Sequence, residues 1–201
     1  MNLLECSLGG PAFLSAMRAG LAYLDTTAQE TLFQRIGEEI TDLPVVESAP
    51  KHHLSASYAG KSGISEDFFV GRGMFYLTED RKLCLDCTSG HYQMLLGYQP
   101  PELTKAVADA LELGVVWDNH ANIAQAPVKR LASALVEAAN PPGGAEPAID
   151  RVMLGCCTGS VACESALKMQ LHYYQTRRNP DATPAVVVLE GNYHGTNMIP
   201  Q

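Results

Sequence analysis

VMLGCCTGSVACESALKMQLHYYQ, residues 152–175, and AVVVLEGNYHG, residues 185–195, are the stretches that decide the fold of this chain. The first stretch opens with a short apolar run, turns tightly, and continues with apolar residues at helical spacing. Residues 185–189 form a continuous apolar run, which is typical of a strand that is covered on both faces. A strand–helix–strand unit makes its two strands parallel through a right-handed crossover. The sequence therefore predicts an α/β fold with a parallel sheet.

The turn after the first apolar run has the parts needed to hold a phosphate. Gly159 lets a ligand approach the backbone closely, and free N–H groups at the start of the helix favour an anion. The hydroxyl groups of Thr158 and Ser160 add hydrogen-bond donors. The same residue types also occur at a plain capped helix start, so the turn alone leaves both interpretations open. Neither a Walker loop nor the dinucleotide fingerprint G-x-G-x-x-G is present in the sequence.

A second loop, residues 191–195, follows the second apolar run. Its Tyr193, next to His194, offers a flat ring on which a planar cofactor can stack. Parallel sheets bind ligands beyond the carboxyl ends of their strands, and both loops would lie at that edge. A phosphate grip and a stacking ring at one edge are what a phosphorylated aromatic cofactor requires.

At these positions the sequence resembles the class III (ornithine, acetylornithine and ω-amino acid) aminotransferases. Residues 157–168, CTGSVACESALK, are similar to the family segment N-S-G-T-E-A-N-E-A-A-L-K, and residues 193–195 match its aromatic-His-Gly element. Residues 71–77 and 85–90, GRGMFYL and LDCTSG, are similar to its opening motif, and residues 96–107, LGYQPPELTKAV, to its L-G-H-x-x-P-E-L-x-x-A-V. The resemblance covers most of the chain after its first third.

The resemblance implies a fold type I (aspartate aminotransferase-like) pyridoxal-phosphate (PLP) enzyme, here truncated, with an incomplete parallel-sheet large domain. Such an enzyme transfers an amino group between an amine or amino acid and a 2-oxo acid, and it is normally a homodimer. Three parts are expected: a helical extension and connector (1–65), a β segment of the small domain (66–95), and the first part of the PLP-binding large domain (96–201).

The resemblance also assigns roles to single residues. Thr158, Gly159 and Ser160 are expected to bind the cofactor phosphate. Tyr193, with His194 beside it, is expected to stack on the pyridine ring. Tyr92, two residues after Gly90, is expected to contribute an aromatic ring to the substrate pocket.

No catalytic residue is expected within this chain. The family places the acid that faces the pyridine nitrogen, and later the Schiff-base lysine, beyond the position of Gln201. None of the six lysines of the sequence stands in the family's lysine context, and Lys168 fits an exposed helix lysine. We therefore expect the isolated chain neither to form a Schiff base with PLP nor to transaminate.

Composition excludes several other classes of protein. With 46% hydrophobic residues, 18% charged residues and a net charge of −8, the chain is globular and has no basic face for nucleic acid. No apolar run approaches the length of a membrane span, and no signal peptide is evident, so a cytoplasmic location is expected. Cys84 and Cys87 are three residues apart in a predicted strand and point to opposite faces, so we expect no metal site.

Further elements follow from apolar periodicity and from turn residues. They are a helix from about residue 11 to 24, a second from a capping box at 27–30 to about 43, a hairpin with its turn at 78–82, and helices near 101–111 and 128–138. Other functions remain open on the sequence alone. They include another PLP activity such as an aminomutase or decarboxylase, a non-catalytic phosphate- or nucleotide-binding module, and a remnant that serves only in dimerisation.

Overall fold

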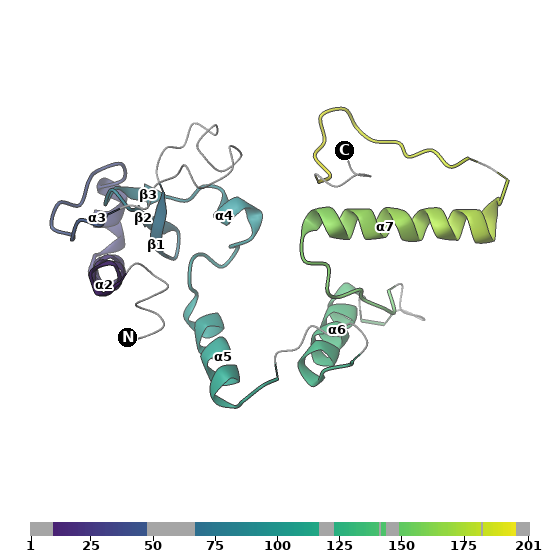
Figure 1. The fold of residues 1–201 in the computed structure, drawn as a ribbon, viewed down its shortest axis with the longest axis horizontal. Helices are drawn as coiled ribbons and strands as arrows, with labels where there is room; N and C mark the ends of the chain where they lie inside the picture. The colour runs from purple at the N-terminus through teal and green to yellow at the C-terminus, as the bar shows by residue number, and fades with distance from the viewer. Residues whose placement is uncertain are drawn as a thin grey trace. The chain divides into compact units, whose positions relative to one another are not determined.

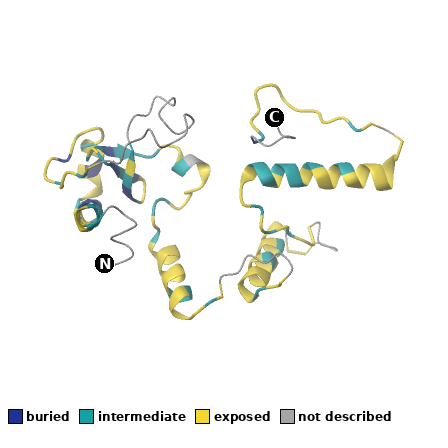
Figure 2. Ribbon diagram, in the orientation of Figure 1, coloured by how far each residue is buried: buried dark blue, intermediate teal, exposed yellow. Residues whose placement is uncertain are grey.

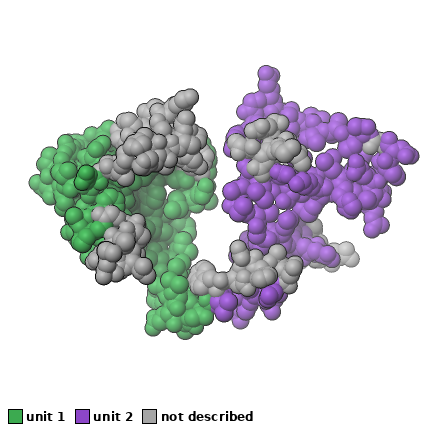
Figure 3. Space-filling model, viewed as in Figure 1, with its two compact units in different colours: residues 1–115 green, residues 116–201 purple. Residues whose placement is uncertain are grey.

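The structure is a computed structural model that describes residues 10–47, 67–116, 123–140, 142–143, 149–181 and 183–195. The chain divides into two compact units, residues 1–115 and 116–201, each of which is considered by itself (Figure 1, Figure 3). The domain boundaries expected near residues 65 and 95 stay a prediction. No helix in the described part of the chain is both long and apolar enough to cross a bilayer.

The first unit is built on a three-stranded antiparallel sheet in the order β1-β2-β3. Its strands are β1 (Phe68–Arg72), β2 (Phe75–Thr78) and β3 (Leu83–Leu85). Strands β2 and β3 pair as a hairpin, with Tyr76 opposite Cys84, so the hairpin predicted from the sequence is confirmed. Along β2, Phe75 and Leu77 are buried and Tyr76 between them is half-buried, which indicates one covered face, and Thr78 at the end of the strand is buried as well.

The hairpin turn anchors a distant part of the chain. Thr78 is fully buried, and its Oγ1 accepts a hydrogen bond from the backbone N of Lys82 at 3.0 Å. Arg81, with a φ of 63°, occupies the left-handed region, and its guanidinium donates to the carbonyls of Thr41 at 3.3 Å and Leu43 at 3.1 Å. The turn therefore holds the segment that follows the second helix against the sheet.

Helix α2 (Pro11–Thr26) covers one face of the sheet at close range. Proline fits its first turn because the first backbone N–H has no partner within the helix. Its buried positions are spaced four apart on one face: Ala16, Gly20 and Leu24. A Cβ added at Gly20 would lie 2.9 Å from Cγ2 of Val70 and 3.2 Å from Cδ1 of Leu77. Glycine thus sets how closely the helix approaches the strands.

The core of the first unit lies between α2, the next helix and the sheet (Figure 2). The residues of this core are Leu24, Leu32, Ile40, Val70, Phe75, Leu77 and Leu83. The ring of Phe33 meets that of Phe75 edge to face, with centroids 5.1 Å apart. This core explains why the N-terminal helices are part of the same unit as the strands.

The second predicted helix is shorter than the sequence indicates. Helix α3 (Gln29–Gln34) starts at an N-cap, Ala28, with no side-chain hydrogen bond, so the predicted capping box is wrong. After the helix, Gly37 adopts a φ of 89° and donates its N–H to the carbonyl of Leu83 at 2.8 Å. Ile40 is fully buried there. Pairing with the sheet replaces the last predicted turns of the helix.

Three of the remaining helices are predicted by the sequence, and the short helix at Ser89–Tyr92 is not. The first unit adds α4 (Ser89–Tyr92) and α5 (Pro101–Glu112), and the second contains α6 (Ala126–Ala139) and α7 (Gly159–Tyr173), which continues into a π-helical turn, η2 (Tyr174–Arg178). Helices α5, α6 and α7 bury none of their described residues, and Figure 2 shows them largely exposed. The predicted helices near 101–111, 128–138 and 161–175 are confirmed.

The predicted parallel strands are wrong. Residues 152–154 and 185–189 carry no strand, and the side chain of Val187 is 94% exposed. A strand needs a neighbouring strand to satisfy its backbone hydrogen-bonding groups. Among the described residues, no strand pairs with either segment. The second segment instead runs along α7, from which it is separated by a cavity of about 620 Å³ lined by residues such as Leu167, Leu171 and Ala185 (Figure 1).

The close approach at Gly20 generates a stability prediction. Replacing Gly20 by Leu forces the helix away from β1 and β2, and we expect it to lower the free energy of unfolding by about 1–3 kcal/mol. Ala22→Leu, on the exposed face of the same helix, serves as the control and should change it by less than about 0.5 kcal/mol. Denaturant unfolding measures both, and equal midpoints for the two variants would contradict the packing.

Candidate cofactor site

Helix α7 begins at a well-defined cap. Thr158 is its N-cap residue, with extended backbone, and its Oγ1 accepts a hydrogen bond from the N–H of Val161 at 3.2 Å. Its carbonyl accepts from the N–H of Ala162 at 3.0 Å. Among the described residues, nothing lies within 4 Å of the position that a Cβ would take at Gly159. Gly159 is exposed, so a ligand can approach the helix start at that residue.

The second predicted loop reaches this helix start. Gly195 is buried, and a Cβ added there would lie 2.5 Å from Oγ and 2.8 Å from Cα of Ser160. Its φ of 124° also favours glycine. The loop itself begins with a turn in which the N–H of Asn192 donates to the carbonyl of Leu189 at 3.2 Å. The two loops that the sequence placed at one edge thus lie together at the start of α7, although the sheet around them is absent from the described residues.

This loop presents two different groups. The side chain of Tyr193 is 76% exposed, so its ring is accessible to a ligand. Nε2 of His194 is buried and has no hydrogen-bond partner among the described residues. An unpaired buried nitrogen costs about 1–3 kcal/mol, and a ligand that offers a partner removes that cost. An accessible ring, an unpaired nitrogen and a helix start fit a planar phosphorylated group such as PLP.

The charges near the helix start are partly compensated. Glu164 lies in the second turn of α7, and its Oε1 is 2.6 Å from Nζ of Lys168. The ion pair reduces the repulsion that Glu164 would exert on a bound anion. The side chain of Lys168 is 63% exposed, in agreement with an ordinary helix lysine.

Tyr92, the predicted substrate-side aromatic residue, belongs to the first unit. It ends helix α4, its side chain is 77% exposed, and its φ is 68°. Ser89 and Gly90 also adopt left-handed backbone, with φ of 52° and 56°. The structure thus places Tyr92 on a strained turn, and the roles of this and the other predicted site residues stay predictions.

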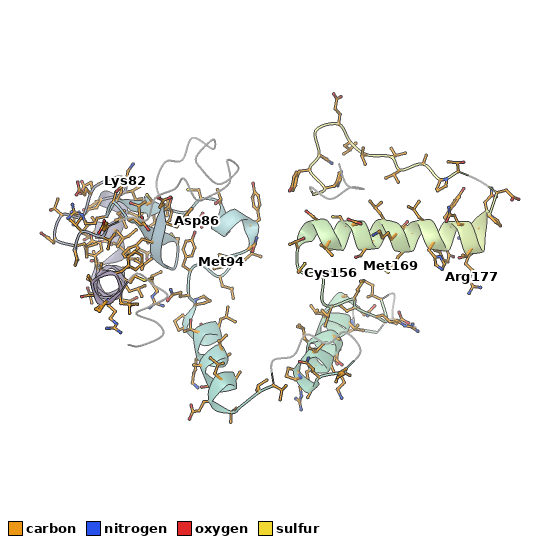
Figure 4. The ribbon with its side chains drawn as sticks, in the orientation of Figure 1. Lys82, Asp86, Met94, Cys156, Met169 and Arg177 are labelled. Carbon is orange, nitrogen blue, oxygen red and sulfur yellow. The ribbon has the colours of Figure 1, made fainter. Side chains whose placement is uncertain are left out.

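Sequence reasoning missed the group that holds this turn. Oδ1 of Asp86 accepts hydrogen bonds from the backbone N of Thr88 at 2.7 Å and from its Oγ1 at 2.9 Å. Oδ2 accepts from the N–H of Gly90 at 2.6 Å (Asp86 is labelled in Figure 4). The Tyr98 hydroxyl lies near the same carboxylate. An Asp followed two residues later by Thr is the local signal that would have found it, because this spacing is typical of an Asx turn.

The pKa values of Asp86 and Tyr98 are both shifted from their ordinary values. Burial raises the pKa of Asp86, but the hydrogen bonds from Thr88, Tyr98 and Gly90 together lower it below its usual value. Burial, the hydrogen bond to Asp86 and the negative charge of Asp86 raise the pKa of Tyr98 to about 12. Asp86 is therefore ionised and Tyr98 protonated across the neutral range.

Tyr98 itself is fixed on the sheet. Its backbone pairs with Gly73 through hydrogen bonds of 3.0 Å and 2.7 Å, in an isolated antiparallel bridge. A Cβ added at Gly71 would lie 2.8 Å from Cγ of the Tyr98 ring, so the ring rests directly on that strand. Its edge meets the ring of Tyr76, with centroids 6.3 Å apart. The acceptor that holds the turn is thus tied to a rigid element.

The family model described as "Aminotransferase class-III" matches residues 65–200. A solved structure from work on the directed evolution of transaminases by ancestral reconstruction is similar in fold, with a TM-score of 0.57 and 19% identity over 86% of this chain and 35% of that chain. An amine transaminase from an uncultivated Pseudomonas species, in its PLP-bound internal aldimine form, has a TM-score of 0.49 and 24% identity over 65% of this chain and 28% of its own. The search of curated proteins gives no match.

The chain thus spans well under half of the length of these solved structures. The predicted fold class, the α/β fold type I of PLP-dependent transferases, is confirmed, here with a small and incomplete sheet. Since the family model covers well over half of the 201 residues, the chain belongs to the class III aminotransferase family.

Proposed function

We propose that the full-length protein that contains these residues is a PLP-dependent aminotransferase, which moves an amino group between an amine or amino acid and a 2-oxo acid. The observation that carries the proposal is the contact of Gly195 with Ser160, where a Cβ would come within 2.5 Å of Oγ. That contact brings an accessible ring and an unpaired buried nitrogen to the start of a long helix. Family membership supports the same activity.

The start of α7 would hold the cofactor phosphate. Backbone groups of Gly159 and Ser160 and the hydroxyl of Thr158 lie at the positive end of the helix dipole. An anion at such an end gains about 0.3–1 kcal/mol from the dipole, in addition to its hydrogen bonds. The open space at Gly159 permits the approach of phosphate oxygens. These residues therefore bind and orient the cofactor.

The loop that ends at Gly195 would hold the cofactor ring. Tyr193 would stack on the pyridine, and Nε2 of His194 would gain the partner that it lacks. When bound, PLP supplies an electron sink and carries the amino group. Tyr92, on its strained turn, would contribute to recognition of a small amine or amino acid. A homodimer and a cytoplasmic location belong to the same proposal.

The contact at Gly195 can be tested with pyridoxamine phosphate, which has no aldehyde and cannot label surface lysines. We expect Gly195→Ala to weaken its binding at least about tenfold, because the new methyl group displaces Ser160 and about 1.5–3 kcal/mol of charged hydrogen bonding is lost. Gly143→Ala is the matched control, since Gly143 also has a positive φ, of 90°, but no atom within 4 Å of its Cβ position among the described residues. Calorimetric titration gives both dissociation constants. Equal binding of pyridoxamine, which lacks the phosphate, would refute the site.

The stacking role of Tyr193 gives a second prediction. Tyr193→Ala should weaken pyridoxamine phosphate binding by roughly 2- to 12-fold, the loss of about 0.5–1.5 kcal/mol of ring contact. Tyr193→Phe keeps the ring and should bind as the parent protein does. Tyr173→Ala, which removes a 55% exposed ring far along α7, controls for surface effects. A Tyr193→Ala variant with unchanged affinity contradicts stacking.

The lysines of residues 1–201 give a third prediction. After incubation of the 201-residue chain with PLP and reduction with borohydride, peptide mass spectrometry should find no lysine modified stoichiometrically. Lys168, the lysine in the helix of the proposed cofactor site, has its ammonium group 2.6 Å from Glu164 in an ion pair and is exposed, so it lacks the enclosed surroundings of a Schiff-base lysine. Lys168→Arg should leave the pattern unchanged. Full modification of one lysine would show that this chain carries the reactive amine.

A further inference from the structure

We propose that Asp86 is a positioning residue, which together with Tyr98 fixes the Ser89–Tyr92 turn and so sets where the ring of Tyr92 projects for the amino donor. This inference rests on the proposed aminotransferase function. It assigns to Asp86 no contact with substrate or cofactor. Its effect passes through the backbone of the turn.

The backbone conformation of the Ser89–Tyr92 turn is not one that its residues prefer. Ser89 and Tyr92 both have positive φ, of 52° and 68°, a region that residues with a side chain rarely adopt. Such strain persists only where the surroundings hold the backbone in place, and it is concentrated at functional sites. The surroundings must therefore supply the constraint.

The backbone of the turn sets the direction in which the Tyr92 side chain leaves the chain. That side chain is 77% exposed. Its N–H donates to the carbonyl of Thr88 at 2.8 Å, which makes the start of the turn the reference point for the ring. Whatever holds Thr88 and Gly90 therefore holds Tyr92.

Asp86 holds both of these residues. One carboxylate oxygen takes two hydrogen bonds from Thr88, and the other takes the 2.6 Å bond from Gly90. Both oxygens are needed, so an amide at this position keeps only part of the arrangement. The Tyr98 hydroxyl lies near the carboxylate, and the Tyr98 backbone is bound to the sheet through Gly73. A chain of contacts thus runs from the sheet to the turn.

The ionisation of Tyr98 reports on this chain of contacts. The groups that face its ring are Asp86, after β3, and Tyr76, on β2. Because the pKa of Tyr98 is raised to about 12, its contribution to stability is complete below its ordinary pKa, about 10, and is lost as the pH rises through about 12. Removal of the Asp86 carboxylate removes two of the causes of the shift.

The first test needs no cofactor. In protein with ¹³C-labelled tyrosine ring carbons, Asp86→Ala should lower the pKa of Tyr98 below about 12, with the resonance assigned by Tyr98→Phe. Amide exchange at Gly90 should rise at least about tenfold, and the Tyr92 resonance should broaden or shift, since the hydrogen bond to the turn is lost. Asp86→Asn should show a smaller change, and Asp80→Asn, an exposed carboxylate in the β2–β3 turn, none. Unchanged Gly90 exchange and Tyr92 signals in Asp86→Ala would overturn the proposal.

The second test uses the PLP-loaded full-length enzyme, because residues 1–201 alone are not expected to transaminate. Asp86→Ala and Tyr92→Ala should each raise the KM for the amino donor several-fold, while kcat and the dissociation constant of pyridoxamine phosphate change little. Asp86→Asn, which is milder and guards against a loss of folding, should lie between Asp86→Ala and the parent protein. An unchanged KM in a folded Asp86→Ala variant that still binds pyridoxamine phosphate refutes the inference alone. A protein that binds no pyridoxamine phosphate refutes the proposed function, and the resonance measurements then still decide the role of Asp86.

Discussion

The contact between Gly195 and Ser160 is the constraint on which the proposed cofactor site depends. A methyl group at position 195 would lie 2.5 Å from Oγ of Ser160, so only glycine lets the loop close onto the helix start. Closure carries Tyr193 and His194 with it, because they immediately precede that glycine. The helix contributes polar backbone groups, and the loop contributes a ring and a buried nitrogen. Neither part alone distinguishes a cofactor site from a capped helix beside an ordinary loop.

The first unit also contains glycines that permit close approaches between segments. Gly71 admits the ring of Tyr98, and Gly97 comes so close to Gly73 that a Cβ would lie 2.7 Å from its carbonyl oxygen. These contacts let Tyr98 reach Asp86, and Asp86 in turn holds a turn with strained backbone. In both units a small residue allows a close approach, and a polar group next to that approach performs the specific task. The elements that are proposed to carry function are thus positioned by close backbone packing.

The sequence predicted the elements whose signals are local. Proline, glycine and apolar spacing indicated helices α5, α6 and α7, and turn residues indicated the β2–β3 hairpin. It failed where the outcome depends on distant neighbours. Ile40 continues a helical pattern but is buried against the sheet, because Gly37 turns the chain toward Leu83. The pair of Asp86 and Tyr98 escaped notice because its partners meet only after the sheet has formed.

The strands predicted at residues 152–154 and 185–189 are also wrong because strand formation depends on distant neighbours. The candidate site does not depend on those strands. Apolar runs report that both faces of a segment prefer burial, but a strand forms only beside another strand, and none lies there among the described residues. The start of α7 needs no such neighbour. Thr158 caps it through Val161, and Gly195 closes onto Ser160 within the same unit. The helix start is held by a cap within the helix itself, and the loop reaches it through one direct contact. A sheet requires repeated pairing between neighbouring strands. The two loops therefore come together although the sheet is incomplete.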